Sequence, residues 1–336
     1  MIFVTGATGI LGRVIVLELL KRGKTFRAAK RPTSNLEDVK HSFQFYTENS
    51  EDYFNKINWI DVDFKDSDSL EQALIGVTEI YHCAAKVSFH PDDKTEMQKC
   101  NIEFTENLLY QCQNSSVEKF LYVSSIAVLD NENENGIFDE DSNFNPKEDH
   151  SDYAISKHFA EMEVWRASAE GLNTIIINPG VIIGSGNWNN SSGKLINELL
   201  NNKFSFSGNS AYVDVRDVAK ISIDLMEKNS FGERFILISE SKSYQEVANF
   251  LRLKLNKSKV KILPYWILKI GVFFNFLLGW LIKPLKMINS VNVKSVSFHS
   301  EISNEKIKRE LNFKFIPVFQ SLDFHLKNYL KDHPKI

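Results

Sequence analysis

Short apolar stretches alternate along the chain with segments in which apolar residues recur at helical spacing. The stretches are rich in β-branched and aromatic residues, and we predict strands at 2–5, 25–29, 57–62, 79–83, 119–123 and 173–177. The helical segments are 10–20, 67–74, 95–113 and 153–169. A strand recurs about every thirty residues, which predicts parallel strands joined by right-handed crossovers in a doubly wound α/β sheet.

Two polar segments follow predicted strands. Residues 130–149 are rich in Asn, and residues 184–193 are rich in Asn, Ser and Gly, so we predict loops at both places. Sheets of this architecture bind their ligands beyond the carboxyl ends of the strands. We therefore expect a ligand site near these loops.

Residues 264–284 form the most apolar segment of the chain. The segment is nearly long enough to span a bilayer, but Lys269 and Asn275 would make a span costly. We expect a helix or a helical hairpin that covers a bound ligand. A peripheral contact with a membrane interface is the alternative.

Composition narrows the class of protein. The chain of 336 residues exceeds one usual core, so we expect two domains or one domain with an appended lobe. A net charge of -3 gives no general attraction to nucleic acid, which we exclude as a partner. Cys83, Cys100 and Cys112 lack metal-ligand spacing, so we expect buried, reduced thiols and no metal site. No leader-like segment precedes the first predicted strand, and we expect a cytoplasmic protein.

A glycine-rich turn separates the first predicted strand from the first predicted helix. Gly6 permits a sharp turn, Gly9 lets a pyrophosphate approach the backbone, and Gly12 lets the helix pack closely on the strand. Strand, turn and helix come in the order that a dinucleotide site requires. The alternative is a tight turn that only connects two elements.

Tyr153 and Lys157 lie four residues apart in a predicted helix, so their side chains share one face. Such a pair is common on helix surfaces. Here it follows Ser124 and Ser125, which end a predicted central strand, and the chain opens with a dinucleotide-type turn. The combination indicates an active site far more specifically than any one feature does.

These features resemble the extended short-chain dehydrogenase/reductase family, also described as NAD(P)-dependent epimerase/dehydratases. Within that family the chain looks closest to the dihydroflavonol-reductase and 3β-hydroxysteroid-dehydrogenase-like branch. The resemblance rests on motifs at 5–12, 61–63, 82–89, 101, 122–125, 153–157, 178–180 and 212–219. It implies a Rossmann-type domain at 1–180, to which 210–240 returns, and a smaller C-terminal α/β substrate lobe at 181–209 and 241–336.

The resemblance also implies roles for individual residues. Tyr153 would protonate a carbonyl oxygen, Ser125 would donate a hydrogen bond to that oxygen, and Lys157 would lower the phenol's pKa once cofactor and substrate exclude water. Asn101 would anchor a water chain behind Lys157, and a helix cap is its alternative role. The cofactor would contact Gly6, Thr8, Gly9, Ile10, Leu11, Gly12, Arg31, Asp63, Phe64, Ala84, Ala85, Lys86, Ser124, Tyr153, Lys157, Pro179, Gly180 and Val181. The substrate would contact Val87, Phe89, Ser125 and Trp188.

Residues 27–31, in and directly after the second predicted strand, favour NADP(H) over NAD(H). NAD would need a carboxylate there for its adenosine ribose, but the sequence has Arg27, Lys30 and Arg31, which suit a 2′-phosphate. Glu37 and Asp38 follow closely and leave NAD open.

We expect an oxidoreductase that transfers hydride between this cofactor and a ketone or alcohol on a fairly hydrophobic small molecule. Ile126 and Ala127 stand where sugar 4,6-dehydratases of the family carry an acidic pair, so dehydration is disfavoured. A nucleotide-sugar 4-epimerase with tightly bound NAD is the first alternative, and a non-catalytic dinucleotide sensor is the second. The sequence leaves open whether the chain forms a homodimer.

Overall fold

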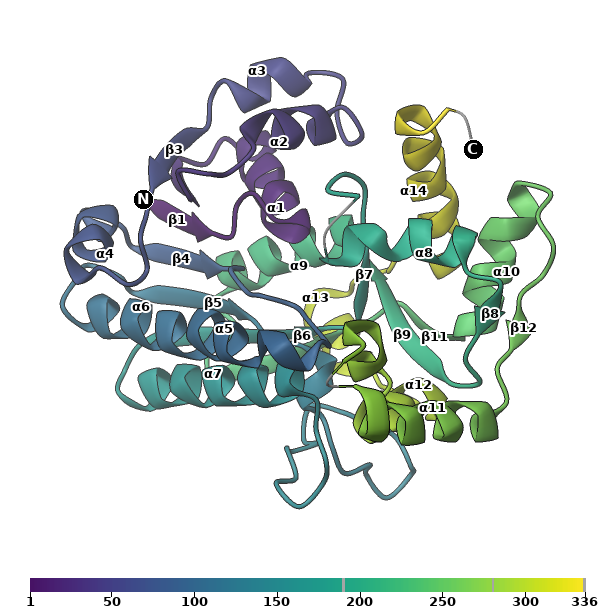
Figure 1. Ribbon diagram of the computed structural model, residues 1–336. Coiled ribbons are helices and arrows are strands. Elements are labelled where there is room, and N and C mark those ends of the chain that lie inside the picture. The colour runs from purple at the N-terminus through teal and green to yellow at the C-terminus, as the bar shows by residue number, and fades with distance from the viewer. Residues whose placement is uncertain (189–190, 280, 335–336) are drawn as a thin grey trace.

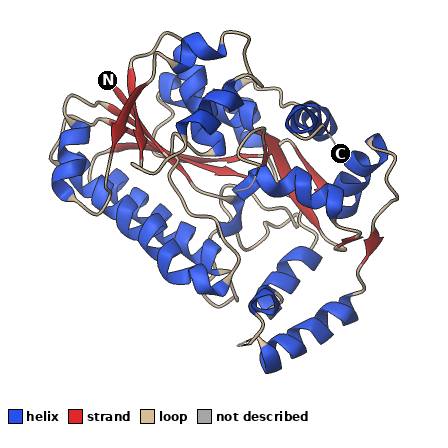
Figure 2. Cartoon of the chain, turned by 45° about the horizontal axis from the view of Figure 1, so that its top comes forward, coloured by secondary structure: helices blue, strands red, loops and turns tan. Residues whose placement is uncertain are grey.

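Seven parallel strands form the central sheet of the computed structural model, which describes residues 1–188, 191–279 and 281–334. The strand order is β10-β6-β5-β4-β1-β2-β3. The strands are β1 (Ile2–Thr5), β2 (Phe26–Lys30), β3 (Asn58–Asp61), β4 (Glu79–His82), β5 (Lys119–Val123), β6 (Asn173–Pro179) and β10 (Glu233–Leu237). The predicted doubly wound α/β sheet of Rossmann type is confirmed, and β10 adds a strand that the pattern did not single out (Figures 1 and 2).

Helices cover both faces of this sheet (Figure 2). One layer contains α1 (Ile10–Lys21), which packs on α2 (Leu36–Phe43) and α9 (Val215–Lys228). The other layer contains α4 (Ser67–Leu74), α6 (Phe104–Gln113) and α7 (Asp152–Ala169), packed side by side. Each layer buries its own apolar cluster against the strands, which is why the strands are apolar on both faces.

The predicted helix at 95–113 forms as three consecutive segments. These are α5 (Lys94–Gln98), a π-helical turn (Lys99–Glu103) and α6. Asn101 lies in the π turn, and its buried amide is held by groups outside the helix. A π turn inserts an extra residue and often accompanies a functional site.

The smaller C-terminal lobe combines two short sheets with helices. One sheet has the order β11-β9-β7, and the other pairs β12 with β8. Its strands are β7 (Val181–Ile183), β8 (Phe204–Ser205), β9 (Asn209–Asp214), β11 (Glu240–Ser243) and β12 (Lys261–Ile262). Its helices are α8 (Leu195–Asn201), α10 (Tyr244–Lys254), α11 (Tyr265–Leu278), α12 (Ser290–Ser297) and α14 (Val318–Asp332). Two other short helices pack beside the main sheet: α3 (Ser50–Phe54) contacts α1 and α2, and α13 (Glu305–Leu311) contacts α9 and β10. The segment 210–240 contributes to both parts, since β9 joins the small sheet whereas α9 and β10 join the main sheet and its helix layer. The division into a Rossmann-type domain and a substrate lobe is therefore a proposal.

The apolar segment after Pro264 forms α11, which contacts both α12 and the short helical turn Lys283–Met287 that precedes α12. Figure 1 shows α11 at the lower edge of the molecule. Across the described ranges, no helix combines the length and the apolar character needed to cross a bilayer. Residues 130–149 contain no helix or named strand, as predicted, and Phe138 makes one bridge to Ile302.

Candidate active site

The glycine turn between β1 and α1 leaves the start of the helix open. Gly6 has φ +63°, a conformation that favours glycine, and a Cβ on Gly12 would overlap the carbonyl oxygen of Gly6. Gly9 is the N-cap of α1 and offers no side chain to cap the first turn. The first N–H groups of a helix have no partner within the helix, so this turn fits an anionic phosphate group.

The residues between Thr8 and Gly12 have different surroundings. Ile10 and Leu11 bury their side chains, so only their backbone N–H groups can face a ligand. The carbonyl of Thr8 accepts a hydrogen bond of 2.6 Å from Arg13, a buried residue of α1. These contacts place a cation directly behind the turn.

Three basic residues lie in β2 or directly after it, in the predicted 2′-phosphate region, and the structure separates their roles. Arg27 donates to the carbonyls of Ala73 and Ile75 at the end of α4, at 3.0 and 2.9 Å. Lys30 forms an ion pair of 2.5 Å with Asp61. Arg31 is exposed, and within the described part of the chain its guanidinium has no ion pair. Arg31 is therefore the residue of the three that is free to meet a phosphate.

Asp38 at the start of α2 is engaged by a cation. Its carboxylate lies 2.9 Å from the guanidinium of Arg13, and its backbone carbonyl accepts from the same group at 3.4 Å. Sequence reasoning noted Asp38 but not its partner, because Arg13 lies 25 residues away on another helix.

Asp63 and Phe64 follow the carboxyl end of β3, as Arg31 follows that of the neighbouring strand β2. Asp63 is exposed and accepts from the N–H of Lys65, as in a turn. The ring of Phe64 stacks on Phe104, with centroids 6.0 Å apart, and the carbonyl of Phe64 accepts from Asn107. The carboxylate of Asp63 thus remains available to solvent, while Phe64 is fixed by α6.

The loop after β4 is fastened to α7 through Asn101. The amide oxygen of Asn101 accepts from the N–H of Lys86 at 2.7 Å, and its amide nitrogen donates to the Lys86 carbonyl and to Ser156 Oγ, each at 2.9 Å. Ala84 and Ala85 precede this clamp, and Ala84 lies against Gly6. The Lys86 ammonium pairs with Asp93 and Glu96. The helix-cap role for Asn101 is wrong, because the residue lies within the π turn rather than at a helix start.

Tyr153 stands in the first turn of α7 beside Ser125 and Phe89. Burial raises the pKa of Tyr153, and a hydrogen bond between its hydroxyl and the Ser125 side chain only partly offsets the rise. The ring of Phe89 meets the Tyr153 ring edge-on, with centroids 5.9 Å apart. A phenol, a hydroxyl and an exposed aromatic ring thus meet where β5 ends.

Lys157 is almost fully buried one turn further along α7. Its ammonium donates to the carbonyl of Val123 at 2.7 Å and lies 4.3 Å from the centre of the Tyr122 ring. Burial lowers the pKa of Lys157 to about 7, and the carboxylate of Glu161 opposes that shift. Burial therefore favours the neutral forms of both Lys157 and Tyr153.

Glu161 is a site residue that sequence reasoning missed. Its buried carboxylate accepts from Ser124 Oγ at 2.6 Å, from Asn178 Nδ2 at 3.1 Å and from Arg234 at 3.2 Å. Ser124 therefore points away from Tyr153, which leaves Ser125 as the hydroxyl beside the phenol. The available signal was spacing, since Glu161 follows Lys157 by four residues on the same helix.

Pro179, Gly180 and Val181 form the junction between β6 and β7. The N–H of Gly180 donates to Leu237 at 3.1 Å, and a Cβ on Gly180 would overlap the carbonyl oxygen of Ala211. The strands of the large and small sheets can approach each other here only because the residue is glycine.

A cavity of about 110 Å³ lies at the start of α7, against Phe89. Its walls come from the loop after β4, the start of α7 and the start of α12: Ser88, Phe89, Pro91, His150, Ser151, Asp152, Asn289, Val291 and Asn292. Phe89 and Val87 are exposed on the loop after β4.

Trp188 lies elsewhere: it packs edge-on against Tyr329 and donates its indole N–H to Asp332 at 2.7 Å. This corrects the prediction for Trp188: its ring packs under α14, and we do not assign it to the substrate site.

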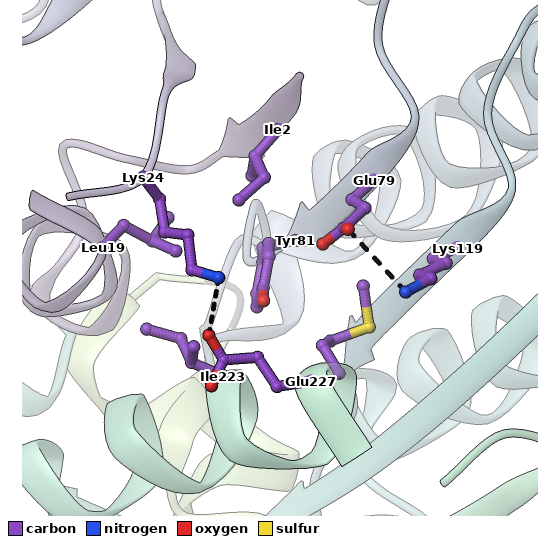
Figure 3. Close-up of a pocket in the computed structure, with 9 residues that line it drawn as sticks. Ile2, Leu19, Lys24, Glu79, Tyr81, Lys119, Ile223 and Glu227 are labelled. Atoms are coloured by element: carbon purple, nitrogen blue, oxygen red, sulfur yellow. Dashed lines mark ion pairs between the residues drawn. The ribbon is translucent and has the colours of Figure 1, made fainter. Parts of the chain in front are cut away.

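A larger cavity, of about 260 Å³, lies at the amino ends of the strands, away from Tyr153. Ile2, Glu79 and Lys119 begin three parallel strands and line it. Figure 3 shows two ion pairs at this cavity, between Lys24 and Glu227 and between Lys119 and Glu79. Because α/β sheets bind ligands at the carboxyl ends of their strands, we do not assign this cavity to the candidate active site.

No cluster of three metal-ligating side chains occurs in residues 1–188, 191–279 and 281–334.

Curated proteins with similar sequences include reductases. The chain is 29% identical to sterol demethylase protein B of Methylococcus capsulatus over 251 residues, which cover 74% of this chain and 72% of that one. It is 27% identical to dihydroflavonol 4-reductase of Arabidopsis thaliana over 273 residues, which cover 75% and 68%.

Solved structures share the fold over nearly the whole chain. The structure of gox2253 superposes with a TM-score of 0.83 at 25% identity, covering 100% of this chain and 99% of that one. Gre2 of Candida albicans in complex with NADPH gives 0.75 at 21% identity, with 99% of both chains covered. A UDP-glucuronic acid 4-epimerase of Bacillus cereus in complex with NAD gives 0.72 at 18%, covering 98% and 96%.

The family model for NAD dependent epimerases/dehydratases matches residues 2–237. That match covers more than half of the chain and includes the glycine turn, Ser125, Tyr153 and Lys157. Proteins named as a reductase and as an epimerase both occur among those with similar sequences or folds, and two of the solved structures contain NADPH or NAD. The chain belongs to the NAD dependent epimerase/dehydratase family of extended short-chain dehydrogenases/reductases, in its dihydroflavonol-reductase-like branch.

Proposed function

We propose that this chain is an NADPH-dependent reductase of a carbonyl group on a fairly hydrophobic small molecule. The observation that carries the proposal is the packing of Tyr153, in the first turn of α7 and next to Ser125, against the exposed ring of Phe89. It supplies a proton donor, a second hydrogen-bonding group for the same oxygen and an apolar wall. Lys157 lies buried one turn further along the same helix.

The cofactor would be held at the carboxyl ends of the strands. The open first turn of α1 would bind the pyrophosphate, Arg31 the 2′-phosphate and Asp63 the adenine amino group. Lys157 would bind the nicotinamide ribose hydroxyls with the N–H donors that Val123 leaves free. When bound, the cofactor supplies the hydride.

The pairing of Arg13 with Asp38 supports NADPH over NADH. Recognition of NAD uses a carboxylate that accepts the adenosine ribose hydroxyls. Of the two carboxylates in the first turn of α2, Glu37 and Asp38, Arg13 already holds Asp38. Arg31 adds an exposed positive charge in the same region.

The pKa shifts support catalysis in the direction of reduction. Burial keeps the Tyr153 hydroxyl protonated at neutral pH, so it can donate its proton to the carbonyl oxygen as that oxygen gains negative charge. Ser125 would stabilise the same oxygen by a hydrogen bond. A protonated Lys157 would then stabilise the resulting phenolate, with Glu161 favouring the charged lysine.

Exposed side chains on the loop after β4 support the substrate class. Phe89 and Val87 are exposed and apolar, and Phe89 packs on Tyr153, although most residues that line the neighbouring cavity are polar. Ile126 and Ala127 follow Ser125, so the acid needed for elimination from a sugar is absent there. The relatives named for a dihydroflavonol and for a sterol fit the same chemistry of a hydrophobic ring compound.

Calorimetric titration with NADPH and with NADH tests this proposal. The protein should bind NADPH at least about tenfold more tightly, since one charge-assisted phosphate contact is worth roughly that factor. Its absorbance after purification should show no retained nucleotide. Tightly retained NAD would overturn the proposal and support the 4-epimerase alternative.

A further inference from the structure

Helix α11 exposes an unusual amount of apolar surface. Of its fourteen residues only Leu268 has a fully buried apolar side chain. Trp266, Phe273 and Phe276 are 62, 59 and 84% exposed, and Leu281 beyond the helix is 61% exposed. The inner side of the helix meets the following segment at Gly271, where a Cβ would lie 2.9 Å from Ile288. The outer side therefore presents large apolar side chains to the surroundings, and contiguous patches of this kind mark interaction sites.

The chain around this helix is strongly basic. Residues 247–300 contain nine Lys and Arg residues and no Asp or Glu, whereas the whole chain has a net charge of -3. Positive charge is thus concentrated in the segment that also carries the exposed apolar side chains.

Several of these lysines have no acidic partner. Lys259 and Lys261 precede α11, and Lys283 follows it, and all three are exposed without an ion pair within the described part of the chain. Lys269 lies within α11, over the ring of Tyr265 at 5.0 Å. Unpaired lysines around an exposed apolar helix match the charge and polarity of an anionic lipid interface.

We propose that the surface formed by α11 and the lysines around it docks on an anionic lipid bilayer. The apolar side chains of α11 would enter the boundary between headgroups and acyl chains, and the lysines would contact lipid phosphates. A second copy of the chain fits this surface less well, because a two-fold contact would set the same lysines of both copies against each other.

The docking surface is connected to the candidate active site. Lys286 pairs with Asp92 at 2.6 Å, and Asn292 donates to the carbonyl of Phe89 at 3.2 Å. Phe89 in turn packs on Tyr153. An apolar substrate dissolved in the bilayer would therefore reach the site over a short path; this step rests on the proposed function, whereas the docking itself does not.

Co-sedimentation with vesicles tests the docking without cofactor or substrate. The full chain should bind vesicles of phosphatidylcholine mixed with phosphatidylserine, and bind those of phosphatidylcholine alone much more weakly. Phe273→Ser/Phe276→Ser and Lys259→Glu/Lys283→Glu should each lower the partition coefficient by about tenfold or more. Ile75→Ser/Tyr110→Ser and Lys56→Glu/Lys331→Glu, at exposed positions elsewhere, should leave it within about twofold.

Two outcomes would overturn the docking proposal. One is absence of binding to anionic vesicles by a wild-type protein that light scattering shows to be a monomer. The other is a dimer that Phe273→Ser/Phe276→Ser dissociates, again without vesicle binding, which would assign the surface to self-association. Neither outcome affects the titration with NADPH and NADH, so failure of the docking proposal can be told apart from failure of the proposed function.

Discussion

Arg31, Arg27 and Lys30 show how far single residues can be interpreted from sequence. All three looked suited to a phosphate, yet Arg27 holds carbonyls at the end of α4 and Lys30 holds Asp61. Those partners lie more than thirty residues away in the chain, so the sequence could not separate the three roles. Tyr153 and Lys157 were predictable, because their spacing of four defines one helix face.

Arg31→Ala should weaken NADPH binding by about tenfold or more while changing NADH binding within about threefold, since only the 2′-phosphate loses a charged partner. Titration of both cofactors by calorimetry measures this. Lys30→Ala is the matched control, because Lys30 already pairs with Asp61, and it should leave both affinities near wild type. Equal losses for both cofactors in Arg31→Ala would contradict the assignment.

At the scale of elements, strands and helices with regular patterns were predicted well, and those made by tertiary contacts were not. β5 and α4 have the predicted bounds. The π turn at Lys99–Glu103 was missed because Asn101 and the loop after β4 fix it, not the local sequence. β11 has the polar sequence Glu-Ser-Lys-Ser and forms a strand because it pairs with β9.

The turn before α1 gives two contrasting substitutions. Gly12→Ala should lower the free energy of unfolding by about 2 kcal/mol, because the new methyl group would overlap Gly6. Gly9→Ala should cost less than about 1 kcal/mol, since its methyl group would lie 3.1 Å from the Gly6 oxygen, but should reduce NADPH affinity. Urea denaturation and calorimetry separate the two effects. Unchanged NADPH affinity in a folded Gly9→Ala variant would refute a phosphate role for the turn.

Asp217 in α9 predicts a pH dependence of stability. Burial raises its pKa from the ordinary 3.8 to about 7, although its carboxylate accepts from the N–H of Ile316 at 2.8 Å. The folded chain keeps this proton where the unfolded chain has lost it, so the group's contribution to stability falls as pH rises from about 4 to about 7. Asp217→Asn keeps an acceptor for Ile316 and removes the titration.

Asp217→Asn should therefore be more stable than wild type by about 2 kcal/mol at pH 8, with the difference shrinking toward pH 4. Urea denaturation across this pH range measures it. A constant difference at every pH would show that folding does not shift the pKa of Asp217.

For the whole molecule, the central sheet and the family were predictable because many weak signals occur in one order along the chain. The distribution of charge was not captured by the net value of -3, which conceals the basic segment 247–300. Whether the apolar segment at 264–284 is covered or exposed depends on packing, and in the structure α11 lies on the surface.

The most direct test of the account is NADPH consumption with a panel of apolar ketones, comparing wild type with Tyr153→Phe. The account predicts that loss of the phenolic proton lowers turnover by about a hundredfold or more, as removal of a general acid does. The affinity for NADPH should stay within about threefold, because the ring and Lys157 remain in place. Near-normal turnover in Tyr153→Phe would contradict the central claim.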